Sequence, residues 1–285
     1  MSSRNNEDRT GARATSEAPP VNPVATPSGE TKPLEFTTPT EFVDLPSKGQ
    51  HYPEDHPLHG KESLEIRYMT AKDEDILTSK SLLKKGLAID RLLQNIIVDK
   101  TVKVDQLLVG DKNALVVAAR ITGYGPEYRT KVTCPNCGFV QEYNFDLHEH
   151  VLTTGGSTEG ATPTGDGIWT VQCPQSQVSV GLRLLTGKDE KSLLQTEQLR
   201  KKNKLPESTA TTNLRLMIAS VNGSSELRDI ANFINVMPAR DAKFLRKAYD
   251  ELMPNIDLSQ DFECQNCGFD MPMEVPFTTD FFWPK

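Results

Sequence analysis

Two short strings with nearly the same residues contain four of the five cysteines. CPNCGFV begins at Cys134, and CQNCGFD begins much later in the chain, at Cys264. A two-residue spacer lets both sulfur atoms of a pair face one point, and the glycine that follows supplies the backbone freedom that a tight turn needs. Each string is therefore typical of a zinc knuckle, a turn between two strands that supplies two thiolate ligands.

Together the two pairs supply four thiolates, the ligand set of a closed, tetrahedral structural zinc site. A catalytic zinc ion needs an open coordination position, and four cysteines leave none. We therefore predict one structural Zn²⁺, with Gly138 and Gly268 shaping the two turns. The predicted ligands are Cys134, Cys137, Cys264 and Cys267.

Reduced thiols and a redox centre are the other roles that suit a CxxC pair. Redox chemistry favours a pair at a helix N-terminus, where the helix dipole lowers the thiol pKa. Residues typical of strands flank the first pair, at 128–132 and 140–145, and this context disfavours redox chemistry. His148 and His150 could be ligands in a different arrangement, but we interpret them as surface histidines. The fifth cysteine, Cys173, is interpreted as a small buried residue.

The charge of the chain bears on its partners. The formal net charge is −7, and no lysine or arginine lies between Lys247 and Lys285, the region of the second cysteine pair. An acidic region repels phosphate, so nucleic-acid binding is the weaker interpretation. The basic clusters at 81–86 and 199–204 are interpreted as helix ends that complement the helix dipole.

Motifs for catalysis and for membrane insertion are absent from the sequence. There is no GxSxG, no P-loop and no dinucleotide fingerprint. No run approaches the roughly 20 apolar residues that span a bilayer, and the first residues lack the apolar core of a signal peptide. We expect a non-enzymatic, soluble protein made in a cytosol, with no small-molecule substrate and no membrane span.

The elements that must position the cysteines predict an α+β fold. Ile89, Leu92 and Ile96 recur at helical spacing, and a further helix is predicted over 113–121. Turn residues and few apolar ones predict a disordered tail, an extended arm that is neither helix nor strand, and a flexible Gly- and Thr-rich linker. The predicted divisions are a tail at 1–35, an arm at 36–61, a first half at 62–150, a linker at 151–167 and a second half at 168–285.

The second half repeats the order of the first. SLEIRYMTAKDE at 63–74 matches SVGLRLLTGKDE at 179–190 in six of twelve positions, at an offset of 116. In both strings the threonine is a predicted helix N-cap, followed by an acidic first turn. The offset has grown to 130 at the cysteine pairs, so an insertion lies between the two matches. The alternative, that strand–cap–helix units simply resemble one another, stays open.

The chain ends in EVPFTTDFFWPK, where four aromatic residues gather. Such a cluster is either a final segment that seals the core or an anchor that enters a neighbouring subunit, because aromatic residues are frequent at interface hot spots. Both interpretations stay open. The aromatic residues are Phe277, Phe281, Phe282 and Trp283.

Three stretches together resemble a known family. LPSKGQHYP at 45–53, IRYMTAKDEDILTSKSLLKKG at 66–86 and FECQNCGFDMPMEVPFTTDFFWP at 262–284 are similar to the baseplate hub assembly proteins of T-even-like contractile-tailed phages. The resemblance covers 42–285. It implies a virion structural protein of viral tail assembly that contacts other hub and tail proteins, located in the tail baseplate and assembled in the host cytoplasm. It carries no catalytic residues.

The residues and the resemblance predict the same kind of protein. We predict a non-enzymatic structural or assembly component of a phage baseplate hub, with two similar halves joined through a zinc ribbon that has four cysteine ligands. The alternative is a zinc-ribbon nucleic-acid-binding or regulatory protein. A basic stripe on one face would favour that alternative.

Overall fold

The computed structural model describes residues 37–153, 155, 160–165, 167–204, 209–276 and 281–282 of the chain. The chain divides into two units at Thr37, and all described residues except Thr37 belong to the second, Thr38–Lys285. The predicted disordered tail at 1–35 lies outside the described residues. So do Phe277 and Trp283 of the aromatic C-terminus.

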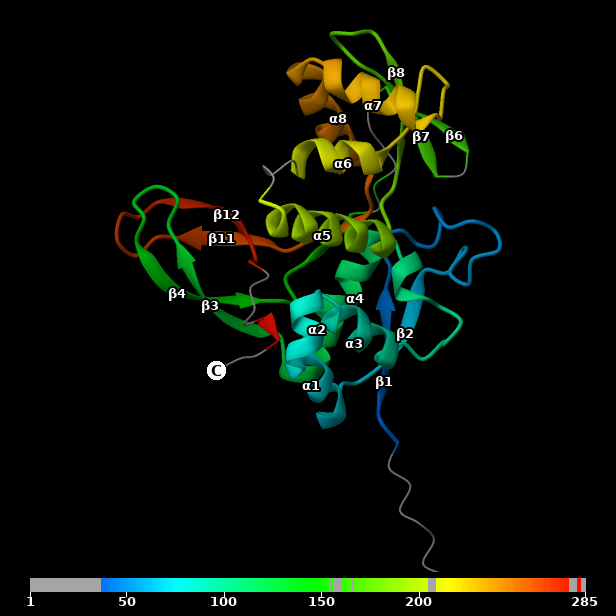
Figure 1. Ribbon diagram of the computed structural model, residues 1–285. Coiled ribbons are helices and arrows are strands. Elements are labelled where there is room, and N and C mark those ends of the chain that lie inside the picture. Colours follow the sequence, from blue (N-terminus) through cyan, green and yellow to red (C-terminus); the bar gives the residue numbers. More distant parts are fainter. Residues whose placement is uncertain are drawn as a thin grey trace, which may run out of the picture. The chain divides into compact units, whose positions relative to one another are not determined.

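Short helices and short antiparallel strands make up the second unit, which confirms the α+β class (Figure 1). The helices are α1 (Ala71–Thr78), α2 (Lys80–Lys85), α3 (Ala88–Ile96), the 3-10 turn η1 (Val104–Gln106), α4 (Val109–Tyr124), α5 (Gly187–Lys202), α6 (Thr209–Met217), α7 (Leu227–Val236) and α8 (Ala239–Leu252). The strands are β1 (Thr40–Asp44), β2 (Ser63–Arg67), β3 (Glu127–Thr133), β4 (Val140–Asp146), β5 (Val151–Thr153), β6 (Thr162–Gly165), β7 (Ile168–Gln172), β8 (Ser179–Arg183), β9 (Ile218–Val221), β10 (Asn255–Asp257), β11 (Ser259–Glu263) and β12 (Asp270–Glu274).

The strands form one four-stranded sheet and several two-stranded ones. The four-stranded sheet has the order β6-β7-β8-β9, and the pairs are β1–β2, β3–β4, β5–β10 and β11–β12. The hairpin β3–β4 confirms the strands predicted around the first cysteine pair, and the hairpin β11–β12 flanks the second pair. The two hairpins lie side by side at the left of Figure 1.

Two segments predicted without strands contain them. In the predicted arm at 36–61, β1 pairs with β2, and Leu45 and Leu58 are buried. In the predicted flexible linker at 151–167, β5 pairs with β10 and β6 pairs with β7. These strands are short and depend on partners that local composition does not reveal, so turn residues alone gave the wrong expectation.

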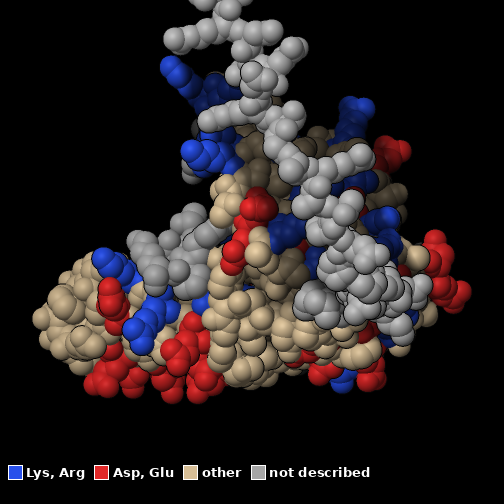
Figure 2. Space-filling view, turned by 90° about the horizontal axis from the view of Figure 1, so that it is seen from below, with Lys and Arg blue, Asp and Glu red and all other residues tan. Residues whose placement is uncertain are grey.

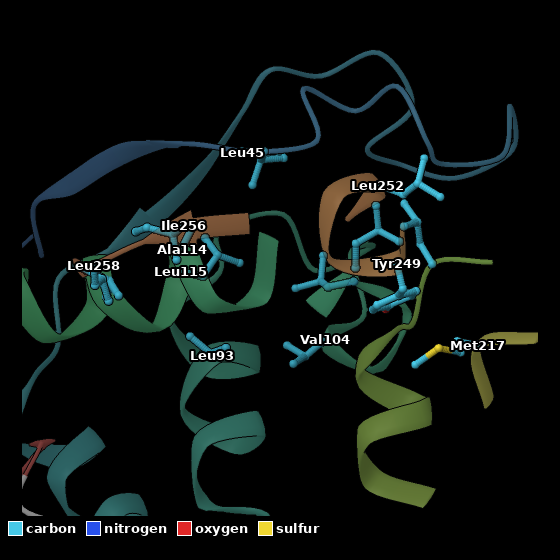
Figure 3. Close-up of a cluster of buried hydrophobic side chains, with 14 of the residues drawn as sticks. Leu45, Leu93, Val104, Ala114, Leu115, Met217, Tyr249, Leu252, Ile256 and Leu258 are labelled. Atoms are coloured by element: carbon cyan, nitrogen blue, oxygen red, sulfur yellow. The ribbon is translucent and has the colours of Figure 1, made fainter. Parts of the chain in front are cut away.

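The predicted helices are confirmed where apolar residues recur at helical spacing. In α3 the buried side chains include Leu92, Leu93 and Ile96, and α4 covers the predicted 113–121 segment. Figure 3 shows Ala114 and Leu115 of α4 beside Ile256 of β10. The two segments approach closely at Gly110, where an added Cβ atom would collide with the carbonyl oxygen of the residue that precedes β10.

An aspartate in the first turn of α1 and another in the first turn of α5 accept similar sets of hydrogen bonds, and Asp73 is fully buried whereas Asp189 is partly buried. The Asp73 carboxylate accepts hydrogen bonds from the backbone N–H and hydroxyl of Thr70, at 2.9 and 2.8 Å, and from the guanidinium of Arg67. Asp189 accepts the same set from Thr186 and Arg183. Both threonines therefore begin their helices with a capping box, which confirms the predicted N-caps.

Fully buried aspartates in α4 and α8 each connect the first turn of their helix to a turn that is distant in the sequence. Asp111 of α4 accepts hydrogen bonds from the Ser47 backbone and hydroxyl, at 2.9 and 2.6 Å, and from the Tyr52 hydroxyl at 2.7 Å. These contacts explain the spacing of LPSKGQHYP, because both of its hydroxyl groups bind one carboxylate. Asp241 of α8 follows Asp111 at the same offset as the two cysteine pairs, and it accepts two backbone N–H groups from the turn at 175–176.

We expect substitution of Asp73 by Asn to destabilise the protein in a pH-dependent way. Burial acts to raise the pKa of Asp73, but the bonds from Arg67, Thr70 and Asn95 outweigh it and hold the pKa well below its usual range. Because the pKa of Asp73 is lower in the folded state, the ionised carboxylate stabilises the fold at any pH above the unfolded-state pKa of about 3.9. This stabilisation is lost as the pH falls through the pKa of the folded state. At pH 7 the loss should be about 2 kcal/mol.

Urea unfolding of Asp73→Asn and of the matched control Asp75→Asn, at pH 7 and at decreasing pH below 4, measures this effect. Asp75 lies on the same helix and is exposed, so its substitution should change stability little. An equal loss in both variants, or a loss that is independent of pH, would contradict the role given to Asp73.

Candidate metal centre

Each cysteine pair lies in the turn of a hairpin. In the first hairpin the N–H of Cys134 donates to the carbonyl oxygen of Phe139, and the N–H of Gly138 donates back to the carbonyl oxygen of Cys134, at 2.8 and 2.9 Å. The second hairpin has the same two bonds between Cys264 and residues 268–269. The glycine of each turn has a positive φ, 73° at Gly138 and 65° in the second turn, as the sequence predicted.

The two turns bring all four predicted cysteines together. Their sulfur atoms all lie within 4.8 Å of one another, although the two pairs are far apart in the chain. The distance between Sγ atoms is 3.9 Å for Cys134 and Cys267, and 3.7 Å for Cys137 and Cys264. Because a disulfide has a sulfur–sulfur distance of about 2 Å, these are four free thiols around one point. Such a group could hold a metal ion.

An asparagine in each turn contacts a sulfur atom of the other hairpin. The amide of Asn136 donates to Sγ of Cys267 at 3.7 Å, and the amide of Asn266 donates to Sγ of Cys137 at 3.6 Å. A hydrogen bond from the backbone N–H of Phe139, together with the Asn266 amide, lowers the pKa of the Cys137 thiol to about 6. The thiolate is the form of cysteine that binds metals.

Side chains also join the two hairpins along their length. Gln141 donates from Nε2 to the carbonyl oxygen of Glu263 at 3.0 Å and accepts from the N–H of Gln265 at 2.9 Å. The Tyr143 hydroxyl donates to the carbonyl oxygen of Asp261 at 2.6 Å. Neither Gln141 nor Tyr143 was predicted from the sequence as a contact between the hairpins. One signal could have revealed them. These two positions are polar or aromatic in the first hairpin, whereas the matching positions of the second hairpin are both methionine.

A buried arginine fixes the base of the first hairpin. Arg120 of α4 donates to the carbonyl oxygens of Gly125, Glu127 and Phe281, at 2.5, 2.8 and 2.6 Å. Tyr128 packs edge-to-face on Phe281, with ring centroids 5.2 Å apart. Phe281 and the next residue are both buried. At these two positions the aromatic C-terminus seals the core.

The remaining candidate residues lie apart from the four sulfur atoms. His148 and His150 are exposed, as predicted, and neither belongs to the cysteine group. Cys173 is fully buried, also as predicted, and burial raises the pKa of its thiol to about 11.

The outer faces of the hairpins carry mainly acidic side chains. Glu263 and Asp270 lie directly opposite each other on β11 and β12, and Glu127 and Asp146 do so on β3 and β4. Figure 2 shows acidic side chains along one side of the lobe at the left, with a few basic ones above them. The described part of the second hairpin contains no lysine or arginine. This surface does not present a basic stripe.

Comparison with known proteins identifies the family. Residues 38–283 match the T4 bacteriophage base plate protein family. The chain belongs to this family. No curated protein and no solved structure matches the chain. The match spans the described α+β unit, including both hairpins, and it confirms the resemblance drawn from the three sequence stretches at 45–53, 66–86 and 262–284.

Membership of the base plate family gives the chain a structural role in a phage baseplate and a location in the virion tail. Interaction with other tail proteins follows from that role. Among the described helices, none has both the length and the apolar character needed to cross a lipid bilayer.

We expect Arg120→Met to destabilise this base plate protein by at least about 3 kcal/mol, because three carbonyl oxygens lose their donor and each buried unpaired group costs about 1–3 kcal/mol. Arg120→Lys should recover only part of the loss, because an ammonium group lacks the planar fork of donors. The matched control Arg129→Met, on the exposed face of β3, should be close to neutral. Urea unfolding measures all three variants, and a neutral Arg120→Met would contradict the assignment.

Proposed function

We propose that this protein is a non-enzymatic structural or assembly component of the baseplate hub, and that it contacts other hub and tail proteins through a fold held together by one structural Zn²⁺. The proposed ligands are Cys134, Cys137, Cys264 and Cys267. The observation that carries the proposal is the meeting of four sulfur atoms from two turns distant in sequence, in a chain of the base plate family.

The distances between the sulfur atoms support zinc. A tetrahedral site with Zn–S bonds of about 2.3 Å places its sulfur atoms about 3.8 Å apart. The Cys134–Cys267 and Cys137–Cys264 distances are 3.9 and 3.7 Å. Four thiolates fill a tetrahedral zinc ion, which leaves no position for a water molecule or substrate. This closed set supports a structural rather than a catalytic metal.

The proposed zinc ion would join the two halves of the chain. Both hairpins are short two-stranded ribbons, and such ribbons are only marginally stable alone. A metal bound by both therefore adds its binding free energy to the folding of the pair. The acidic outer faces support a protein partner over a nucleic acid, because the carboxylates of Glu263 and Asp270 would repel phosphate.

We expect purified protein to contain one zinc ion per chain. Cys134→Ser and Cys264→Ser should each abolish binding, because either substitution opens the same site. Cys173→Ala is the matched control, since it removes a buried cysteine outside the group and should keep the metal. Native mass spectrometry and elemental analysis count the metal, and a chelator should lower the Tm of wild type. Two metals per chain, or none, would contradict a shared site.

We also expect the chain to be part of isolated baseplates or of their assembly intermediates. A tagged wild-type chain should co-purify with hub proteins, whereas Cys134→Ser should be incorporated poorly and Cys173→Ala normally. Density for the chain at the baseplate centre would support the hub assignment. Retention on DNA that falls with rising salt, without incorporation into tails, would favour the zinc-ribbon nucleic-acid-binding alternative.

A further inference from the structure

Strand β1 has one edge that no other strand covers within the described residues. It pairs antiparallel with β2 alone. The N–H of Leu45 donates to the carbonyl oxygen of Glu62 at 2.8 Å, so alternate residues of this strand bond to β2 and those between them point away from it. Thr40, Phe42 and Asp44 therefore present their backbone N–H and C=O groups at the open edge.

The second half contains matching strands. Beyond β2, Ile66 forms a bridge with Ile97. Beyond β8, Leu182 pairs with Ile218 of β9, and Leu182 matches Ile66 at the offset of the repeated sequence. Strand β7, the other partner of β8, thus takes the place of β1. After each of these strands comes a turn held by a buried aspartate, as described for Asp111 and its counterpart in α8.

In the second half, the corresponding edge is covered. Strand β6 pairs antiparallel with the outer edge of β7, with Thr162 opposite Thr170 and Pro163 opposite Trp169. Trp169 is buried, whereas Glu41 in the matching position of β1 is exposed. A strand therefore fits against the outer edge of β7, whereas the matching edge of β1 has no strand partner within the described residues.

A groove of about 190 Å³ lies beside β1. Pockets for small molecules are larger, at about 300–1,000 Å³, so this groove suits a single side chain. Glu41 and Asp44 line the groove together with Phe42, which is 67% exposed, and with His148 and His150. The apolar lining includes Ala114, Val117, Ile121, Leu152 and Ile256.

We propose that the open edge of β1 is a strand-addition site for an extended segment of another tail protein. The segment lies antiparallel to β1, places an apolar side chain in the groove, and directs a lysine or arginine toward Glu41 or Asp44. Neither carboxylate belongs to an ion pair within the described part of the chain. That the segment belongs to a tail protein rests on the proposed function, whereas the strand addition rests on the edge itself.

The charges argue against a second copy of this chain as the added strand. Two copies of β1 pairing about Phe42 would place both copies of Glu41 and Asp44 on one two-stranded ribbon. In that register the two copies of Glu41 are diagonal neighbours, within reach of each other, and their like charges repel. A cationic segment instead offsets the negative charge of β1.

Hydrogen exchange of the full chain tests the proposal, with an acetylated hexapeptide of alternating lysine and valine as the probe. Exchange at Thr40, Phe42 and Asp44 should be fast in the free chain. It should slow about tenfold when the peptide is present at ten times its dissociation constant. Phe42→Pro removes an outward-facing N–H that does not bond to β2, and edge strands tolerate proline at such positions. In this variant the peptide should no longer slow exchange at Thr40 and Asp44. Phe42→Ala is the matched control that keeps the N–H and the protection.

Glu41→Lys gives a second test that leaves the backbone intact, and it should weaken peptide binding by charge repulsion. Slow exchange in the free chain would mean that its own residues or a second copy cover the edge, and would overturn the proposal. Unchanged exchange at saturating peptide would overturn it as well. In isolated baseplates, fast exchange at Phe42 in an incorporated chain would contradict this inference alone. Absence of the chain from baseplates would contradict the proposed function, and the peptide result would still decide the inference.

Discussion

The meeting of two hairpin turns at one group of four sulfur atoms is the constraint on which the rest of the structure depends. Cys134 and Cys264 are far apart in the chain, so their turns can meet only if every element between them is correctly placed. Neither hairpin shares a sheet with the other, and the contacts between them are made by side chains such as Gln141 and Tyr143. A metal ion at this point would convert two marginal ribbons into one rigid lobe.

Hydrogen-bonded carboxylates, buried or partly buried, place the elements that carry the hairpins. Asp73 and Asp189 each join a strand to the helix that follows it, and Asp111 joins the turn at Ser47 to the start of α4. A buried charge is costly unless it is fully hydrogen-bonded, so the buried sites at Asp73 and Asp111 tolerate few arrangements of their neighbours. From the end of α4, Arg120 then connects the first hairpin to the C-terminal segment. These contacts suit a protein whose role in a baseplate is to hold a shape.

The sequence predicted the features that are encoded locally. Cysteine spacing identified the four residues that meet, helical spacing identified α3 and α4, and the threonine caps were found from their acidic first turns. Strands β1 and β5 were missed because their partners are supplied by tertiary structure. Arg120 and Gln141 were missed because a single polar residue in an apolar pattern does not reveal which distant carbonyl oxygen it will meet.

X-ray absorption spectroscopy at the zinc edge, on the purified full chain, tests the central claim most directly, because it reports the identity and distance of the ligand atoms. A site formed by both hairpins predicts four sulfur atoms at about 2.3 Å and no lighter ligand. Nitrogen or oxygen atoms at about 2.0–2.2 Å in the first shell would show that the four cysteines do not form one closed site. That result would contradict the account of two halves joined through a single metal ion.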